Sequence, residues 1–511
     1  MMNPIANMLG LLFISLPSAL GAQIPAQKID AHCQAYSDAD LFSGVVLVAR
    51  NGEVLFKKAY GPADRELEVL VHPGMKFKIG SLSKPFTATL ILQLVDEGIL
   101  SLDDHITDHI PEYSGKGGNL ITIEQLLNHT SGIIGSLDPE REAKEERLYH
   151  NLAEMACMAD TAALCFEPGS GFHYSNFGYQ ILAYIAERAC HIPFDTLLQE
   201  RIFRPMGMSD TRQYDAVRIE PDLVKGYEYK LLKGYENASF IDPSYAAGAG
   251  GLISTVEDLL KFDRGFSQGK MISEELYQEM FRPSEHGPYG LGWEIHQQYM
   301  MPVQDTVRIT SHSGSINGFG AFMGRVERDG LFVAVLKNFR SDTYISPSYA
   351  PRIGGEIISI LYGDTVDLPR KSIAKETGLI LGREGTEQAI KEYHRLRDAE
   401  NEAYTFDESE LNMLGIELLL RFNRPEDALK IFELNIEAYP CSYNTYDSYA
   451  YVLRSMGDYP NAIRAYREGL KVLEKYPEEN QGASIQKDAL NALNFISEME
   501  DERISSDGCS D

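Results

Sequence analysis

The chain has 511 residues, of which 44% are hydrophobic and 24% are charged, so it is long enough for more than one globular domain. Its formal net charge of −28 at pH 7 argues against nucleic acid or an anionic membrane surface as the main partner. The six cysteines are scattered without metal-binding spacing, so we expect no zinc site, and no motif indicates another cofactor.

The N-terminus carries an apolar run, Met8–Leu16, followed by small residues up to Ala22. This run is too short to span a bilayer comfortably and resembles the apolar part of a secretory signal, although no basic residue precedes Lys28. We therefore predict a signal peptide over residues 1–22, export to the periplasm or the exterior, and no transmembrane segment after its removal.

Two apolar, β-branched runs at 44–50 and 53–56 flank Asn51-Gly52, a spacing that predicts a β-hairpin. A second strand-like run, Phe77–Ile79, ends at Gly80. Apolar residues then recur at helical spacing until about Gly98, which predicts a helix that begins close to Gly80.

Ser81 and Lys84 lie at the start of this predicted helix and share one of its faces. A serine hydroxyl becomes a good nucleophile when a base removes its proton, and a lysine can be that base if its pKa is lowered. The alternative is a helix-capping serine followed by a solvated lysine. The Ser-x-x-Lys pattern also occurs at Ser267/Lys270, Ser372/Lys375 and Ser484/Lys487.

From Asp103 to about Pro243 the pattern is mostly helical and rich in loops. The charged run at 140–147 predicts a solvated helix face or an insertion. A glycine-rich turn at 248–254 lacks the spacing of a phosphate-binding loop, so its glycines are attributed to backbone geometry rather than nucleotide binding.

Further along, residues 320–326 and 331–336 flank a turn at 328–330 and predict a second hairpin, followed by a helix from about Ile353 to Leu361. Strands at both ends with helices between them predict one α+β domain. Its antiparallel sheet would be assembled from the two ends of the domain.

Residues 363–378 are predicted to form a linker, because a polar stretch separates the first domain from a continuously helical pattern. Within residues 379–500, Ala428 and Phe432 recur as Ala462 and Tyr466 with a 34-residue offset, which resembles the tetratricopeptide repeat family. These repeats have two alternative roles. They either form a groove for a protein or peptide partner or pack as a helical cap on the first domain. Residues 501–511 form an acidic tail.

Two other short patterns matter because of their order after Ser81. Tyr174-Ser-Asn176 lies in the helical middle of the domain, and His312-Ser-Gly314 with Ser315 lies just before the second hairpin. Both patterns occur elsewhere in the chain, so position rather than the tripeptide singles them out.

With these three motifs in this order, residues 36–362 resemble the serine β-lactamase and penicillin-binding protein superfamily, specifically its class C-like branch. That branch includes D,D-peptidases, D-aminopeptidases and esterases. The resemblance implies a β-lactamase/transpeptidase-like α+β fold with a helical subdomain, followed here by an all-α helical-repeat domain. It extends to the stretches 126–132, 205–208, 250–255 and 290–293.

The resemblance implies that Ser81 attacks the substrate carbonyl and that Lys84 and Tyr174 transfer protons, with either one as the base. It places Asn176, His312, Gly314 and Ser315 at the bound substrate. Asn176 would bind an amide or orient Lys84, and the backbone N–H groups of Ser81 and Ser315 would form the oxyanion hole. Gly314 would let the strand approach the substrate. The resemblance also implies that His129 and Ser131 belong to a structural turn and take no part in catalysis.

The implied function is an exported serine hydrolase that cleaves an ester or amide, including D-amino-acid peptides, through an acyl-enzyme and without metal or cofactor. Many β-lactamases carry lysine where this chain has His312, which disfavours efficient β-lactam hydrolysis. If His312 kept its reference pKa of about 6.5, affinity for a carboxylate-bearing substrate would rise as the pH falls. The alternatives are a penicillin-binding D,D-carboxypeptidase or β-lactamase, and a non-catalytic scaffold whose repeats recruit a partner.

Overall fold

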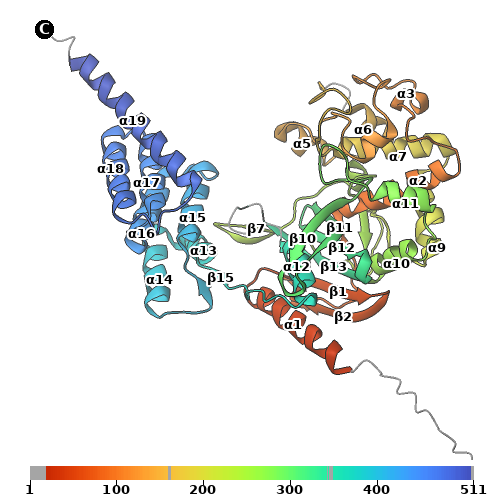
Figure 1. Ribbon diagram of the computed structural model, residues 1–511, viewed down its shortest axis with the longest axis horizontal. Helices are drawn as coiled ribbons and strands as arrows, with labels where there is room; N and C mark the ends of the chain where they lie inside the picture. The colour runs from red at the N-terminus through yellow and green to blue at the C-terminus, as the bar shows by residue number, and fades with distance from the viewer. Residues whose placement is uncertain (1–18, 159–162, 342, 344–348, 508–511) are drawn as a thin grey trace, which may run out of the picture.

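The computed structural model describes residues 19–158, 163–341, 343 and 349–507, which form an α+β region and a C-terminal helical region (Figure 1). Most of the predicted signal peptide, residues 1–18, lies outside the described residues, and residues 19–22 begin helix α1 (Ala19–Asp38). Of the predicted acidic tail, residues 501–507 end helix α19 (Ala483–Asp507), and 508–511 lie outside the described residues. Within the described ranges, every helix is too short or too polar to traverse a lipid bilayer.

A six-stranded antiparallel sheet in the order β10-β11-β12-β13-β1-β2 organises the α+β region. Both predicted hairpins are present, as the pairs β1–β2 and β12–β13, and β1 pairs with β13 from Gly44 opposite Lys337 to Arg50 opposite Leu331. The sheet therefore joins the two ends of the region, as predicted. Its strands are β1 (Gly44–Arg50), β2 (Glu53–Tyr60), β10 (Glu294–Met300), β11 (Asp305–Ile316), β12 (Phe319–Val326) and β13 (Leu331–Lys337).

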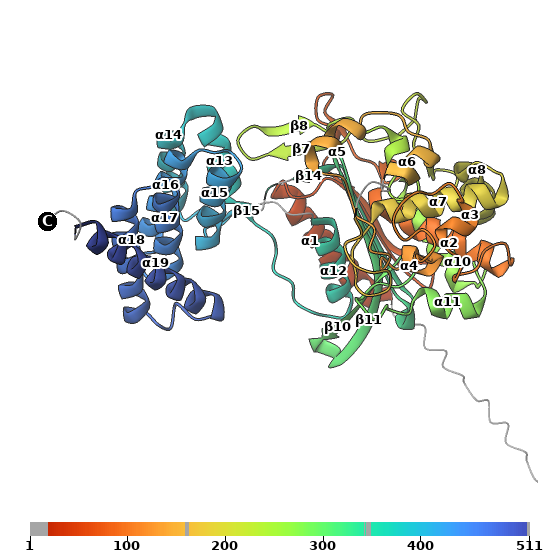
Figure 2. The same cartoon turned by 90° about the horizontal axis from the view of Figure 1, so that it is seen from above.

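Alternating side chains of the central strands supply two hydrophobic cores, one on each face of the sheet. Val46 and Val48 of β1 pack in the core beneath α1 and α12 (Tyr349–Leu361). Val45 and Leu47 face the larger core formed with the helices on the opposite side (Figure 2). Because both faces are covered, the central strands are almost continuously apolar.

The helical subdomain covers the larger core and contains the predicted helices around 123–127 and 181–188. Residues 140–145 of the charged run lie in a helix, none of whose residues is buried, and Glu142 and Glu146 line a cleft. The helices are α2 (Lys84–Asp96), α3 (Ile106–His109), α4 (Ile123–Leu127), α5 (Pro139–Glu145), α6 (Leu152–Met158), α7 (Asn176–Cys190), α8 (Phe194–Leu198), α9 (Arg204–Met206), α10 (Val256–Ser267) and α11 (Glu274–Met280).

Small sheets complete the region and connect its parts. Strand β5 (Phe77–Lys78) pairs with β9 (Leu252–Ser254) immediately before Ser81. The hairpin of β7 (Tyr227–Lys230) and β8 (Gly234–Asn237) pairs with β14 (Phe339–Ser341). The remaining short strands are β3 (Pro62–Asp64), β4 (Val69–Leu70), β6 (Arg212–Gln213), β15 (Lys371–Ser372) and β16 (Tyr404–Thr405).

The C-terminal region is helical, and it begins earlier than the sequence indicated. Helix α13 (Ile373–Glu384) starts inside the range 363–378 that was predicted as a linker. Buried Ala428 and Phe432 lie on α16, and their counterparts Ala462 and Tyr466 lie on α18. The other helices are α14 (Thr386–Asp398), α15 (Glu408–Leu420), α16 (Pro425–Ala438), α17 (Tyr443–Ser455) and α18 (Tyr459–Lys475).

The two regions touch through the tip of the β7–β8 hairpin. Leu231 at this tip is fully buried in the core of the helical region. Gly378 and Gly382, one turn apart on α13, leave space for the tip: a Cβ at Gly378 would lie 2.7 Å from Leu231 Cδ1, and one at Gly382 would lie 1.9 Å from the Leu232 carbonyl oxygen. The Lys375 ammonium also donates to the Asp40 carbonyl at 3.1 Å. These contacts are those expected of a helical cap.

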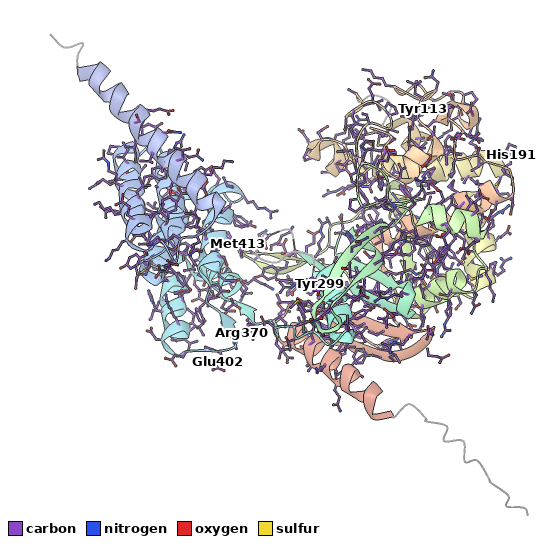
Figure 3. The ribbon with its side chains drawn as sticks, in the orientation of Figure 1. Tyr113, His191, Tyr299, Arg370, Glu402 and Met413 are labelled. Atoms are coloured by element: carbon purple, nitrogen blue, oxygen red, sulfur yellow. The ribbon has the colours of Figure 1, made fainter. Side chains whose placement is uncertain are left out.

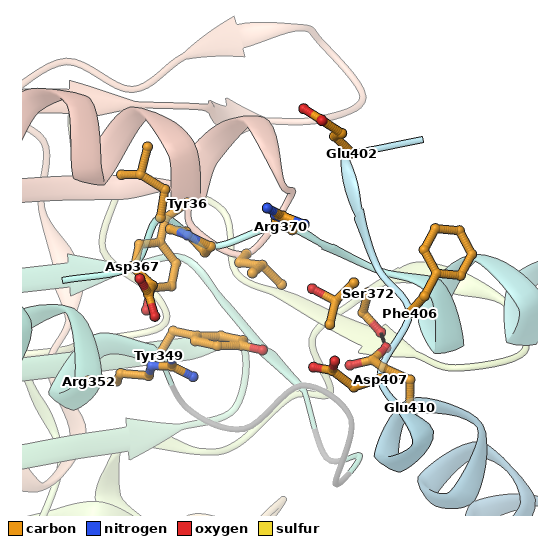
Figure 4. A pocket seen from close by; sticks show the side chains of 14 residues that line it. Tyr36, Tyr349, Arg352, Asp367, Arg370, Ser372, Glu402, Phe406, Asp407 and Glu410 are labelled. Carbon is orange, nitrogen blue, oxygen red and sulfur yellow. Dashed lines mark hydrogen bonds between the residues drawn. The ribbon is translucent and has the colours of Figure 1, made fainter. Parts of the chain in front are cut away.

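A polar cavity of about 860 Å³ lies beside this junction. Tyr36 and Tyr349 line it from the α+β region, and the Ser372 hydroxyl donates a hydrogen bond to Glu410 across from them (Figure 4). Arg370 and Glu402, also at its rim, lie where the chain passes between the two regions (Figure 3).

Two glycines allow strand β11 to lie directly against the turn that carries Ser81. Gly80 has φ = +53°, and a Cβ there would lie 2.8 Å from the Ser315 backbone nitrogen. A Cβ at Gly314 would lie 2.0 Å from the Ile79 carbonyl oxygen. Any side chain at either position must push the strand and the turn apart.

We therefore expect Gly314→Ala to destabilise the protein by about 1–3 kcal/mol, because the added methyl group meets backbone rather than a flexible side chain. Gly355→Ala in α12 is the matched control. Its Cβ would meet nothing within 4 Å, and alanine favours a helix by up to about 1 kcal/mol. Thermal unfolding of both variants tests this, and equal melting temperatures would contradict the steric argument.

Candidate active site

Ser81 and Lys84 lie at the junction of a single-turn 3-10 helix, Gly80–Ser83, and α2. Ser81 is partly exposed in a cleft of about 300 Å³, whereas the Lys84 side chain is fully buried. Lys84 Nζ lies 3.2 Å from Ser81 Oγ, 2.8 Å from Asn176 Oδ1 and 2.9 Å from the Ala249 carbonyl oxygen. The structure therefore brings together the first motif and the asparagine of the second.

Burial lowers the pKa of Lys84 well below its ordinary value, which favours the neutral amine. A neutral amine has two N–H donors and one lone pair. Asn176 Oδ1 and the Ala249 carbonyl can only accept, so they take the two donors. The lone pair is then left for the Ser81 hydroxyl, which is the arrangement that a general base requires.

Tyr174 lies above the same amine, with its ring centroid 4.7 Å from Lys84 Nζ. Burial raises the pKa of Tyr174, and its hydrogen bond with Ser81 only partly opposes this. The phenol therefore holds its proton at neutral pH. Tyr174 is placed to donate to, or accept from, the Ser81 oxygen.

His129 holds the Tyr174 ring in place rather than contacting Ser81. Its ring packs 4.3 Å from that of Tyr174, and its Nδ1 accepts the Ser175 backbone N–H at 3.1 Å. Burial lowers the pKa of His129 well below its ordinary value, which favours the neutral ring. This geometry agrees with its assignment to a structural turn.

The structure changes the expected chemistry of His312. Its Nδ1 lies 2.6 Å from the Ser313 carbonyl, which can only accept, so Nδ1 carries the proton and Nε2 accepts from the Tyr289 hydroxyl at 2.8 Å. Burial lowers the pKa of His312 to about 4. The expected rise in affinity for a carboxylate-bearing substrate as the pH falls therefore loses its basis, because it assumed that His312 keeps its ordinary pKa.

Strand β11 brings Gly314 and Ser315 to the turn that carries Ser81, through the close contacts at Gly80 and Gly314 described above. Ser81, Asn176 and Ser315 line the same cleft. All seven residues singled out from the sequence thus belong to one constellation around Ser81 and Lys84.

Sequence reasoning missed three parts of this site. Tyr289 orients His312, Tyr179 lies 5.5 Å from Lys84 Nζ, and the Ala249 carbonyl binds Lys84 directly. Tyr289 directly precedes the stretch 290–293, and Ala249 lies within the glycine-rich turn at 248–254, so both lie at or beside stretches that the sequence had singled out. However, nothing local indicated that a tyrosine hydroxyl or a backbone carbonyl there would face the site.

We predict that the ring signals of His312 do not shift between pH 8 and 5 in a histidine NMR titration, because its pKa of about 4 keeps it neutral throughout this range. His296 is an internal control, since its hydrogen bond with Glu294 raises its pKa above the ordinary value. His312→Asn assigns the signals. A His312 midpoint near that of an exposed histidine would contradict the assignment.

Comparison with known proteins gives consistent results. Penicillin-binding protein 4* of Bacillus subtilis (strain 168) is 28% identical over 431 residues, which cover 77% of this chain and 92% of that protein. Esterase EstB of Burkholderia gladioli is 30% identical over 348 residues, which cover 60% of this chain and 87% of that protein. The D-amino acid amidase structure from Ochrobactrum anthropi SV3 shares the fold, with a TM-score of 0.56 and 22% identity over 65% of this chain and 97% of that one.

Residues 29–345 match the family model described as Beta-lactamase, which spans more than half of the chain. The fold prediction is confirmed, both for the β-lactamase/transpeptidase-like region and for the helical region after it. The chain belongs to the beta-lactamase family and is a serine hydrolase.

Proposed function

We propose that Ser81 is the nucleophile of an ester or amide hydrolase that works through an acyl-enzyme, with D-amino-acid peptides among its substrates. The observation that carries this proposal is the buried Lys84 amine, whose two carbonyl partners leave its lone pair facing Ser81 Oγ. Proton transfer to Lys84 lets Ser81 attack the carbonyl carbon and form the tetrahedral intermediate.

In the next step Tyr174 gives its proton to the leaving group, and Lys84 returns a proton to Tyr174. This division of roles follows from the opposite effects of burial on the two pKa values, lowered for Lys84 and raised for Tyr174. We therefore propose Lys84 rather than Tyr174 as the base. Asn176 orients Lys84 through its Oδ1.

The backbone N–H groups of Ser81 and Ser315 are the proposed oxyanion donors, and Gly80 and Gly314 bring the two segments close enough for both to serve. His312 forms part of the cleft wall in its neutral form. It therefore does not supply the positive charge that a lysine would offer to a substrate carboxylate, which disfavours a β-lactamase or D,D-carboxypeptidase.

The similarity to an esterase and to a penicillin-binding protein supports acyl transfer without selecting the substrate. The alternative of a non-catalytic scaffold is less favoured, because the site has the hydrogen bonds that a general base needs. We further propose export, on the basis of the apolar N-terminal run. For the 34-residue repeats we propose a capping role, supported by the buried Leu231, over recruitment of a peptide or protein.

We expect intact-mass analysis after exposure to an activated ester, and separately to a penicillin, to detect an adduct that maps to Ser81 and is absent in Ser81→Ala. Ser267→Ala is the matched control, because it lies in another Ser-x-x-Lys pattern and its hydroxyl bonds only the Asp263 carbonyl in the described part of the chain. Turnover of the ester with persistence of the penicillin adduct would favour an esterase or peptidase. Absence of both adducts would favour the scaffold.

The roles of Lys84 and Tyr174 can be separated with a nitrophenyl ester, whose leaving group needs no proton, and an alkyl amide, whose leaving group does. We expect Lys84→Met to lower kcat/KM by about 10²–10⁴-fold for both substrates, as is usual for loss of general base catalysis. Tyr174→Phe should impair amide cleavage more than ester cleavage. Equal losses on both substrates in Tyr174→Phe would instead assign it the role of base.

A further inference from the structure

A buried histidine with an unpaired N–H lies behind the second motif. His129 is fully buried, and its Nδ1 accepts the Ser175 backbone N–H at 3.1 Å. A neutral imidazole has one acceptor and one donor nitrogen, so its Nε2 carries the proton. This Nε2 has no hydrogen-bond acceptor among the described residues. Because nearly all buried polar groups in folded proteins are paired, this exception needs an explanation from the other contacts of the ring.

The backbone of the same residue is also in an unfavourable conformation. His129 has φ = +62°, in the left-handed region that residues other than glycine rarely occupy. Three residues later, a glycine, Gly132, takes up the same region without steric hindrance. Strained backbone of this kind persists where the surrounding structure imposes it, often at a functional site. His129 thus combines two locally unfavourable features.

His129 holds the chain on both sides of Tyr174. Its carbonyl oxygen accepts the His173 N–H at 2.9 Å, and its Nδ1 accepts the Ser175 N–H. The His129 and Tyr174 rings also pack together, with their centroids 4.3 Å apart and an angle of 42° between their planes. One residue therefore fixes the backbone before and after Tyr174 as well as the ring of Tyr174 itself.

The Tyr174 ring connects His129 to the reacting groups. The Tyr174 centroid lies 4.7 Å from Lys84 Nζ, and the pair of Tyr174 and Ser81 is joined by a hydrogen bond. The His129 ring also contacts Tyr289, with centroids 4.6 Å apart. Displacement of the His129 ring would therefore move Tyr174 relative to both Lys84 and Ser81.

We propose that His129 is a positioning residue for the Ser81 reaction. It acts through Tyr174, whose ring it fixes at the distance from Lys84 and Ser81 that proton transfer to the leaving group needs. The proposal rests on the Ser81 chemistry and on the proton-donor role of Tyr174 proposed above. It gives a part in the reaction to a histidine that the family resemblance places in a structural turn.

The test compares the kcat/KM of His129→Asn for the nitrophenyl ester and for the alkyl amide. Asparagine tolerates the left-handed backbone and its Oδ1 can accept the Ser175 N–H, but it lacks the ring that packs on Tyr174. We expect the amide-to-ester ratio to fall about 10- to 100-fold, mainly through kcat, which is the effect of displacing a catalytic group by about 1 Å.

His32→Asn is the matched control. His32 is 1% exposed and contacts Glu356 of α12 through its Nε2, in the core on the other face of the sheet. The same substitution there removes an equally buried ring without moving Tyr174. It should leave the amide-to-ester ratio unchanged, whatever it does to the melting temperature.

A double-mutant cycle with Tyr174→Phe separates positioning from a general structural role. If His129 acts through Tyr174, His129→Asn causes no further loss of amide cleavage in the Tyr174→Phe background. Losses that multiply in the double variant would overturn the proposal. Equal losses on ester and amide in His129→Asn alone would also overturn it.

A second variant keeps the test decisive if His129→Asn does not fold. His129→Phe retains a ring against Tyr174 and leaves the Ser175 N–H without its acceptor, so it should lower the amide-to-ester ratio too. If thermal unfolding shows that neither variant folds, His129 is needed for folding and the proposal is overturned. If the wild-type protein forms no adduct at Ser81 with the activated ester, the proposed function fails first.

Discussion

The site depends on the burial of one amine. Lys84 is removed from water, and no carboxylate in the described part of the chain forms an ion pair with it. A buried ammonium without a counter-charge is so unfavourable that the group gives up its proton instead. Burial of Lys84 thereby favours the neutral amine that its proposed role as a base requires. Three separate segments are needed to enclose this amine: the start of α2, the start of α7 and the turn that contains Ala249.

The second requirement is close contact between backbones. Ser81 lies in a turn and Ser315 on a strand more than two hundred residues later. The absence of side chains at Gly80 and Gly314 lets these segments meet. The sheet makes this contact reproducible, because β11 is fixed by pairing with β10 and β12 along its length. A site assembled from distant segments therefore gains the rigidity of the largest sheet in the molecule.

Local patterns allowed the hairpins, the helix after Gly80 and the closure of the sheet to be predicted, because turn residues and apolar periodicity are properties of neighbouring residues. The residues proposed for catalysis were singled out through the order of three motifs. The low pKa of His312 was not foreseen, since it depends on burial, which is not visible near His312 in the sequence. The unpaired Nε2 of His129 was likewise hidden, because it results from the position of the Ser175 N–H that Nδ1 accepts.

The β7–β8 hairpin has a consequence for how the chain is made. Leu231 at its tip is synthesised long before α13, which packs over the tip at Gly378 and Gly382. During synthesis the Leu231 side chain therefore stays uncovered until α13 has been made. A ribosome that stalls before residue 373 leaves this side chain exposed. The tip of the β7–β8 hairpin is covered only after α13 has emerged.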